Sequence, residues 1–325
     1  MPKAIVVHEL GGPEVLRFEN VAEAAPGPGQ ARVRHTAIGV NFIDVYFRTG
    51  LYKAAALPFV PGQEGAGVVE AVGPDVTDVA VSDRVAYAGL QGAYAEVRLA
   101  PAARLVKLPP SIDDQTAAAM MLKGMTAEYL LLRTARVERG DTILFHAAAG
   151  GVGSIACQWA KSLGVRVIGT VGGAVKVARA RALGCDEVID YQREDVVARV
   201  KDITGGAGVR AVFDGVGKST FDASLACLAP RGMLALFGQS SGSVAPIDPS
   251  LLAKSSLFLS RPVLGHYVAT REELVQSAAK LFAVVASGAV KIEVTQTYPL
   301  AEAARAHADL EGRKTVGSTL LLPGH

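Results

Sequence analysis

The sequence predicts an α/β protein in which a doubly wound parallel sheet is combined with a β-rich, barrel-like domain. Three observations support this prediction. Short strand-like runs, broken by glycine and proline, fill the first third of the chain. From Asp141 onward, strand-like runs alternate with helix-length segments, as they do in crossover units. One of these later strands leads directly into a glycine-rich turn and a helix.

The first third contains several strand-like runs rich in Val, Ala and Tyr, at residues 4–7, 31–33, 65–72, 84–87 and 94–97. Turn sequences such as Gly11-Gly12-Pro13 and Pro61-Gly62 separate them. Many short strands with such breaks predict a compact β-rich domain. Pro109-Pro110 ends this region, and a mostly helical stretch is expected over residues 113–133.

The alternating region predicts strands at residues 142–145, 165–170, 187–190, 211–213, 234–237 and 257–259. Helices fit between them at 152–163, 175–183, 196–203 and 221–228, and Gly164 and Gly184 follow two of these helices as stop signals. Such alternation predicts a parallel sheet covered on both faces. Two later helices are expected at 271–287 and 301–311, with a final strand at 319–322.

Composition excludes several classes of protein. The chain has 325 residues, half of them hydrophobic, and a net charge of +2 without a basic stripe, so no nucleic-acid partner is expected. The three cysteines lie far apart, which argues against a disulfide framework and favours a reducing cytoplasm. The first residues do not have the pattern of a signal peptide. No run reaches the roughly 18 apolar residues that a membrane helix needs, so no membrane partner is expected.

The glycine-rich turn predicts a dinucleotide site of the Rossmann type. After residues 142–145 the chain reads Ala148-Ala149-Gly150-Gly151-Val152-Gly153, which is AxGxxG in place of the usual GxGxxG. Gly150 would let the backbone approach a pyrophosphate, and Gly153 would let the helix pack closely on the strand. The alternative is a glycine-rich turn that binds no ligand.

Charge favours NADPH over NADH at this site. NAD sites carry an acid about 20 residues further on, at the end of the second strand. Here no acid lies between Val165 and Cys185, and Lys176 stands where it would attract a 2′-phosphate. The alternative for Lys176 is a solvated charge on a helix surface.

With these features the chain resembles the zinc-free quinone oxidoreductases of the zeta-crystallin type, in the medium-chain dehydrogenase/reductase superfamily. The resemblance extends over almost the whole chain. It is carried by Gly11-Gly12-Pro13-Glu14-Val15-Leu16, Gly39-Val40-Asn41-Phe42-Ile43-Asp44, Gly50-Leu51-Tyr52, Pro61-Gly62-Gln63-Glu64-Gly65-Ala66-Gly67, Lys123-Gly124-Met125-Thr126-Ala127 and the Ala148–Gly153 turn. It implies a GroES-like catalytic domain at residues 1–122 and 266–325, with a Rossmann NADPH-binding domain inserted at 123–265.

The resemblance also implies that no metal is bound. Zinc-dependent relatives have Cys where this chain has Asn41, His where it has Gln63, and a third ligand where it has an apolar residue near Leu122. Zinc needs three or four converging Cys, His or carboxylate ligands, and the scattered cysteines cannot supply them. A reaction without a Lewis acid suits an electron-poor acceptor such as a quinone.

The same resemblance implies a set of cofactor contacts. Around the nicotinamide it places Asn41, Phe42, Asp44, Tyr46, Thr126 and Tyr129, and at the pyrophosphate Gly150, Gly151 and Val152. At the 2′-phosphate it places Gly172, Lys176, Tyr191 and Arg313, and along the rest of the groove Val216, Phe237, Gln239, Ser240, Leu264 and Gly265. The alternatives are core packing for Phe42, Val216, Phe237 and Tyr191, and a turn role for Asn41.

The candidate catalytic residues are Tyr52 and Asn41. Tyr52 matches a tyrosine that enoyl-thioester reductases of this superfamily place near the substrate, where a phenol can donate to a carbonyl oxygen. The alternative is an aromatic side chain that only shapes the pocket. The histidines have no neighbours in sequence that mark a catalytic triad.

These features predict an NADPH:quinone oxidoreductase. The first alternative is an NADPH-dependent enoyl or alkenal reductase. The second is a crystallin-like protein that binds NADPH without turnover, or an RNA-binding protein, although the chain lacks a stacking motif. A cytoplasmic homodimer is expected, with residues 256–260 as an edge strand that pairs with its symmetry mate.

Overall fold

The computed structural model describes residues 1–324, which form two compact units. Unit 1 holds Met1–Met125, Val268–Ala286 and the residues from Ile292 onward, and unit 2 holds Thr126–Tyr267 and Ser287–Lys291. The domain limits expected after residues 122 and 265 stay a prediction and differ from these units by a few residues. Among the described residues, no helix combines the length and the apolar character needed to cross a membrane.

Unit 2 is built on a six-stranded sheet in which every neighbouring pair is parallel. Its strands are β8 (Thr142–Phe145), β9 (Arg166–Val171), β10 (Glu187–Asp190), β11 (Val209–Asp214), β12 (Leu228–Leu236) and β13 (Phe258–Ser260). The order β10-β9-β8-β11-β12-β13 is that of a Rossmann sheet, which confirms the predicted fold class.

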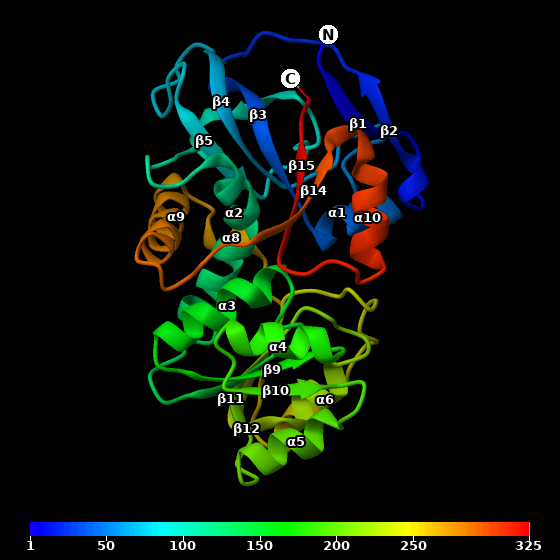
Figure 1. The fold of residues 1–325 in the computed structure, drawn as a ribbon, viewed down its shortest axis with the longest axis vertical. Coiled ribbons are helices and arrows are strands. Elements are labelled where there is room, and N and C mark those ends of the chain that lie inside the picture. The colour runs from blue at the N-terminus through cyan, green and yellow to red at the C-terminus, as the bar shows by residue number, and fades with distance from the viewer. Residues whose placement is uncertain (325) are drawn as a thin grey trace. The chain divides into compact units, whose positions relative to one another are not determined.

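Helices cover both faces of this sheet. They are α3 (Gly151–Ser162), α4 (Ala174–Ala182), α5 (Val196–Ile203) and α6 (Phe221–Ala226), and unit 2 also contains the four-residue helices α7 (Ser250–Ala253) and α8 (Leu264–Tyr267). Figure 1 shows α3 and α4 on one side of the strands and α5 on the other. Gly164 and Gly184 follow α3 and α4 with φ of 79° and 92°, so the predicted stop signals have the left-handed backbone that favours glycine.

Unit 1 contains a seven-stranded sheet and a separate two-stranded sheet. The larger sheet has the order β14 (Val294–Pro299), β15 (Ser318–Leu322), β3 (Gln30–Val40), β4 (Glu64–Val72), β5 (Arg84–Ala88) and β7 (Val106–Lys107), and β6 (Val97–Pro101) also pairs with β3. The smaller sheet pairs β1 (Lys3–Val7) with β2 (Leu16–Asn20). The parallel β14–β15 pair and the antiparallel β15–β3 pair bring the C-terminal segment into the sheet of the N-terminal strands.

Unit 1 also contains helices. They are α1 (Phe42–Thr49), α2 (Asp114–Glu128, whose last three residues belong to unit 2), α9 (Arg271–Ala286) and α10 (Ala303–Glu311). Single 3₁₀ turns are η1 (Pro13–Val15), η2 (Ala102–Arg104) and η4 (Leu300–Glu302). Helix α10 packs against α1 and η1, so a C-terminal helix lies beside the N-terminal segment (Figure 1).

One local prediction was wrong, and several elements of unit 1 were not predicted. The strand expected at 94–97 begins only at Val97. Before it, Ala95 forms only an isolated bridge with Ala4, in which Ile5 N donates to the Tyr94 carbonyl at 2.8 Å and Glu96 N donates to the Lys3 carbonyl at 2.9 Å. Helix α1 and strands β2, β7 and β14 were not predicted. The α1 sequence is rich in aromatic and β-branched residues, which have modest helix propensity, so packing decides its conformation.

Candidate active site

In unit 2, residues expected to contact the cofactor follow the carboxyl end of every strand of the parallel sheet. The turn with Gly150 follows β8, and Val216 follows β11. In this strand order, ligands bind outside the carboxyl ends where the order reverses, and that point lies between β8 and β11. The ends of the other strands are followed by Gly172, by Tyr191, by Phe237, Gln239 and Ser240, and by Leu264 and Gly265.

The turn between β8 and α3 is tight enough to require glycine. A Cβ atom on Gly153 would lie 2.5 Å from the carbonyl oxygen of Ala147 and 2.7 Å from that of Ala148. Backbone oxygens cannot move aside, so any side chain there would push α3 away from β8. Gly150, at the N-cap of α3, has no side chain that could bond the first N–H groups of the helix. The helix start can therefore receive an anion.

A buried carboxylate holds the turn after β11. Asp214 Oδ1 accepts hydrogen bonds from the backbone N–H of Val216, at 2.7 Å, and of Gly217, at 3.0 Å. Its Oδ2 accepts from the hydroxyls of Thr220, at 2.7 Å, and Ser224, at 2.8 Å. Both oxygens are fully used, so this turn is fixed from beneath.

His146 joins this carboxylate to the end of β9. Its Nε2 lies 3.0 Å from Ser224 Oγ, and its Nδ1 lies 2.9 Å from Thr170 Oγ1. Burial lowers the pKa of His146, which keeps the ring neutral. The Ser224 hydroxyl donates its hydrogen bond to Asp214 and therefore accepts from the Nε2–H of His146. His146 Nδ1 then accepts from the Thr170 hydroxyl. The ring thus has a structural role, as expected for an isolated histidine.

The segment after β9 carries the residues expected near a 2′-phosphate. A Cβ on Gly172 would lie 2.6 Å from the Tyr191 hydroxyl, so these two residues are in close contact. Lys176 lies in the first turn of α4 and is partly exposed. Asp190, at the end of β10, accepts the N–H of Gly173 at 2.9 Å, and this bond lowers the pKa of its carboxyl group. The backbone N–H of Gly173 therefore engages this acid.

In unit 1, Asn41 lies at the start of α1 with both its backbone and its side chain fixed. Its N–H donates to Asp44 Oδ2 at 2.9 Å, and its Nδ2 donates to Glu64 Oε1 at 2.8 Å. Glu64 is fully buried, accepts the N–H of Leu122 at 2.7 Å, and forms an ion pair with Lys123. The Asn41 amide is thus oriented by a buried ion pair.

Aromatic rings gather on α1 and the turn after it. The Tyr52 ring centroid lies 5.1 Å from that of Tyr46 and 5.8 Å from that of Phe47, and Phe42 lies 6.4 Å from Tyr46. Tyr52 N donates to the carbonyl of Tyr46 at 2.9 Å. The structure therefore brings Tyr52 to the helix that carries Phe42, Asp44 and Tyr46.

Thr126 and Tyr129 lie where α2 ends. Tyr129 begins a π-helical turn, η3 (Tyr129–Thr134), and its ring stacks on Tyr267 with centroids 4.4 Å apart. The side chains of Thr126 and Tyr129 are almost wholly buried. Turns of this kind often occur at functional sites. Arg313 follows α10 in unit 1, with a φ of 57°.

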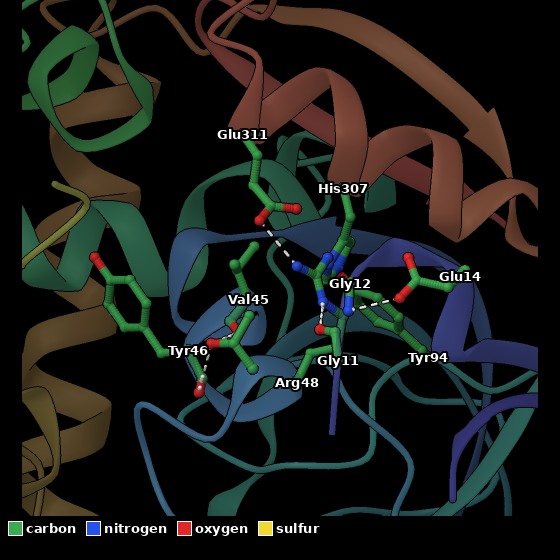
Figure 2. Close-up of polar contacts among 10 residues, drawn as sticks. Gly11, Gly12, Glu14, Val45, Tyr46, Arg48, Tyr94, His307 and Glu311 are labelled. Carbon is green, nitrogen blue, oxygen red and sulfur yellow. Dashed lines mark hydrogen bonds and ion pairs between the residues drawn. The ribbon is translucent and has the colours of Figure 1, made fainter. Parts of the chain in front are cut away.

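Figure 2 shows a second network, around Arg48, that no sequence pattern indicated. The buried guanidinium lies 3.0 Å from His307 Nδ1, donates to Glu311 at 2.8 Å and donates to the carbonyl of Gly11 at 3.1 Å. In the same view the Tyr46 side chain points away from this cluster. Arg48 and His307 are 259 residues apart, so only the fold brings them together.

His307 connects this cluster to the start of α1. Its Nε2 lies 2.9 Å from the Tyr94 hydroxyl, which donates to Asp44 Oδ2 at 3.0 Å. Burial raises the pKa of Asp44 to about 7, and burial with the nearby Arg48 charge lowers the pKa of His307 to about 3. The chain therefore contains a neutral histidine and a carboxyl group that titrates near neutrality.

Comparison with known proteins identifies the family. The family described as alcohol dehydrogenase GroES-like domain matches residues 27–110, and the one described as zinc-binding dehydrogenase matches residues 151–283. A quinone oxidoreductase of Pseudomonas aeruginosa is 52% identical over 99% of this chain and 100% of its own length. The chain belongs to the quinone oxidoreductase family of the medium-chain dehydrogenases/reductases.

Two further members of this superfamily bear on the site. The crystal structure of Escherichia coli quinone oxidoreductase complexed with NADPH matches with a TM-score of 0.97 and 47% identity, covering 99% of this chain and 100% of that one. A 2-haloacrylate reductase of a Burkholderia species is also 47% identical, over 99% of both chains. The predicted family is confirmed.

One of the matching families is described as zinc-binding, but the residues of this quinone oxidoreductase family member do not fit zinc. The Asn41 amide is engaged by Glu64, and Gln63 is a second carboxamide, which is not a zinc ligand. Within residues 1–324, no three His, Cys, Asp or Glu side chains converge as metal ligands.

Proposed function

We propose that this chain is an NADPH:quinone oxidoreductase that works without a metal. The observation that carries the proposal is the set of turns at the carboxyl ends of the strands in unit 2. It combines the Gly153 close approach, an open helix start and an acid-free segment with Lys176. The relatives named quinone oxidoreductase, and the related structure solved with NADPH, support the same activity.

The chain's own residues fit NADPH in two places. Gly150, Gly151 and Val152 would hold the pyrophosphate at the start of α3, where N–H groups and the helix dipole favour anions. Gly172, Lys176, Tyr191 and Arg313 would hold the adenosine 2′-phosphate. Bound NADPH would supply a hydride.

The residues of α1 would form the nicotinamide and acceptor side. Asn41, fixed by Glu64 and Lys123, would present an oriented amide. Phe42, Tyr46 and Tyr52 would supply flat aromatic walls to a planar acceptor. A quinone is electron-poor, so it accepts reducing equivalents without a Lewis acid and takes its proton from water.

A second candidate function is the reduction of α,β-unsaturated carbonyl compounds. Tyr52 lies against Tyr46, and a phenol there could donate to a carbonyl oxygen. The 2-haloacrylate reductase is as similar to this chain as the Escherichia coli enzyme, at 47% identity. This activity predicts faster turnover of enals than of 1,4-benzoquinone under matched conditions.

Lys176→Glu tests the cofactor assignment. We expect NADPH affinity to fall by roughly ten- to a hundredfold, the size of a lost charged contact, with NADH affinity nearly unchanged. The control is Arg181→Glu, which makes the same charge change at the exposed far end of α4 and should affect both cofactors alike. Equal losses for NADPH and NADH in Lys176→Glu would remove Lys176 from the 2′-phosphate site. Fluorescence titration measures both affinities.

The absence of a metal requirement is tested separately. Elemental analysis of the purified protein should find no stoichiometric zinc, and quinone reduction should be unchanged after dialysis against a chelator. Loss of activity that added zinc restores would contradict the metal-free assignment.

We also propose a cytoplasmic homodimer. Strand β13 lies at the edge of the parallel sheet, and Phe258 on it is 57% exposed. Pairing of two β13 strands would cover this edge. The three free, buried cysteines suit a reducing compartment. Phe258→Glu should shift the sedimentation of the chain from dimer to monomer, whereas Val175→Glu, an exposed site on α4, should not.

A further inference from the structure

A buried chain of hydrogen bonds runs from Arg48 to the first turn of α1. It passes from Arg48 to His307 at 3.0 Å, to Tyr94 at 2.9 Å and to Asp44 at 3.0 Å, and Asp44 in turn accepts the Asn41 N–H at 2.9 Å. The four side chains are buried, and the exposed fraction of each is at most 1%. The outer end reaches the surface at Glu311, which is about one third exposed.

The donor in each link is fixed by chemistry. A guanidinium has no acceptor, so His307 Nδ1 must accept from Arg48. The neutral ring then carries its proton on Nε2 and donates to the Tyr94 oxygen. The Tyr94 hydroxyl therefore donates its hydrogen bond to Asp44 Oδ2. All links therefore point toward the Asp44 carboxylate and favour its ionised form.

Asp44 is only half satisfied by these bonds. Both of its hydrogen bonds fall on Oδ2, and Oδ1 is buried without a hydrogen-bond partner among residues 1–324. Burial without a partner penalises the charge and raises the pKa of the carboxyl to about 7, while the bonds from Asn41 and Tyr94 lower it. A proton can therefore occupy Oδ1 near neutral pH.

The other charged groups around Asp44 have opposing effects. Glu64 on β4 raises the pKa of Asp44, and Lys123 on α2 lowers it. Arg48, on α1 itself, lies behind His307. Glu64 and Lys123 are paired with each other. The hydrogen bond from Tyr94 is therefore the side-chain contact that acts directly on the ionisation of Asp44.

Ionisation of Asp44 changes the start of α1. An ionised acceptor makes a hydrogen bond about twice as strong as a neutral one, and a negative charge in the first turn suits the helix dipole. The ionised carboxylate thus holds the Asn41 N–H firmly, and the protonated form holds it weakly. We propose that Asp44 is a positioning residue whose ionised carboxylate, held by Tyr94, His307 and Arg48, fixes Asn41 for turnover. This inference rests on the proposed function, because turnover with a quinone is its readout.

The first measurement is the pH dependence of kcat/KM for NADPH-driven quinone reduction by the full chain. We expect wild type to gain roughly tenfold as the pH rises through about 7, since a charged hydrogen bond is worth about one pKa unit or more. Asp44→Asn, which keeps the shape and an acceptor oxygen, should show the low value at every pH.

Tyr94→Phe is the decisive variant. It removes only the hydroxyl that favours ionised Asp44, so the midpoint should rise by about one to two pH units. The matched control is Tyr87→Phe, because Tyr87 is equally buried in unit 1 and its hydroxyl lies 2.7 Å from His35. The Tyr87–His35 pair ends on the carbonyl of Ala95, 2.6 Å from His35 Nδ1, and does not bond Asp44. The pH midpoint of kcat/KM in Tyr87→Phe should therefore stay at the wild-type value.

His307→Gln provides a second test if Tyr94→Phe does not fold. A glutamine can accept from Arg48 and donate to Tyr94, so the midpoint should remain within about half a pH unit of wild type, whereas His307→Leu should raise it. A midpoint that is the same in Tyr94→Phe and His307→Leu as in wild type would overturn the inference.

Infrared spectroscopy separates this inference from the proposed function. The difference spectrum between wild type and Asp44→Asn should contain a protonated-carboxyl band that disappears as the pH rises through about 7, with no substrate present. The band's midpoint should rise in Tyr94→Phe. If the band behaves so but no quinone is reduced at any pH, the proposed function is contradicted. If quinones are reduced with a pH profile that Asp44→Asn leaves unchanged, the positioning role is contradicted.

Discussion

Each of the two units holds a buried aspartate at the turn or helix start of its candidate site, and the two aspartates differ in how fully they are bonded. Asp214 in unit 2 accepts four hydrogen bonds, two on each oxygen. Asp44 in unit 1 accepts two, both on Oδ2, and its Oδ1 has no partner among the described residues. A fully bonded carboxylate makes a rigid turn, and a half-bonded one makes a helix start that responds to pH.

The difference matches the role proposed for each unit. The turn after β11 lies next to the expected pyrophosphate position, where fixed geometry aids binding. The start of α1 carries Asn41, for which a role at the nicotinamide and acceptor is proposed. The four predictions below test this contrast.

The largest effect is expected from Asp214→Ala. It leaves four donors without their acceptor. The two buried ones, Gly217 N–H and the Ser224 hydroxyl, cost about 1 to 3 kcal/mol each, and the two part-buried ones cost less, so unit 2 should lose about 3 to 6 kcal/mol of unfolding free energy. Trp159, the single tryptophan of the chain, lies in α3 and reports this unfolding by fluorescence. Asp222→Ala, exposed on α6, should change it by less than about 0.5 kcal/mol. A loss below about 1 kcal/mol in Asp214→Ala would show that water replaces the carboxylate.

Asp44→Asn should change how stability depends on pH. The pKa of Asp44 is raised from 3.8 to about 7, so folding favours the protonated form. The stabilisation is fully present below about pH 4 and is lost as the pH rises through about 7. Relative to wild type, Asp44→Asn should therefore gain about 3 kcal/mol between about pH 5 and pH 8. Native-state hydrogen exchange of the β3 and β4 amides measures this difference in unfolding free energy. If the difference between Asp44→Asn and wild type is constant from about pH 5 to pH 8, Asp44 stays ionised over that range.

The contribution of His307 to stability should depend on pH in the opposite direction to that of Asp44. The pKa of His307 is lowered to about 3, so the folded chain excludes a proton that the unfolded chain binds below about pH 6.5. Its contribution to stability is present above that pH and falls by about 2 kcal/mol on acidification to about pH 5. His307→Gln cannot titrate and should lose about 2 kcal/mol less than wild type over that range. The same hydrogen-exchange experiment reports it, and identical acid sensitivity in both proteins would contradict a buried neutral His307.

The smallest effect is expected at the outer end of the chain. Glu311 is about one third exposed, so its ion pair with Arg48 is weakened by solvent. Glu311→Gln should cost at most about 1 kcal/mol and should leave the Asp44 midpoint unchanged. Chemical denaturation measures the stability loss, and the pH profile of kcat/KM measures the midpoint. A shifted midpoint would mean that the surface charge of Glu311 affects the ionisation of Asp44.

Much of the Rossmann domain could be predicted from local sequence. The strands at 142–145 and 187–190 and the helix at 196–203 coincide with β8, β10 and α5. Strand-helix alternation and glycine stops are local signals, and the residues expected around the cofactor turn follow the strand ends. Close contacts such as that of Gly172 with Tyr191 then follow from the sheet order.

The networks in unit 1 could not be predicted in the same way. Arg48 and His307 are 259 residues apart, and Tyr94 and His307 are 213 apart. Such contacts leave no periodicity or spacing in the sequence. Helix α1 was missed for the same reason, because its stability comes from packing against α10 rather than from helix propensity. Asn41 and Asp44 entered the site through resemblance alone, and the structure adds what holds them.

The most direct test of the central claim is a steady-state screen of the purified chain with NADPH, in chelator, against quinones, enals and enoyl thioesters. Nicotinamide absorbance reports the rate in each case. The proposed function predicts that quinones give the highest kcat/KM and that NADPH is preferred to NADH. Oxidation of NADPH with none of the quinones, or faster turnover of an enal than of any quinone, would contradict it.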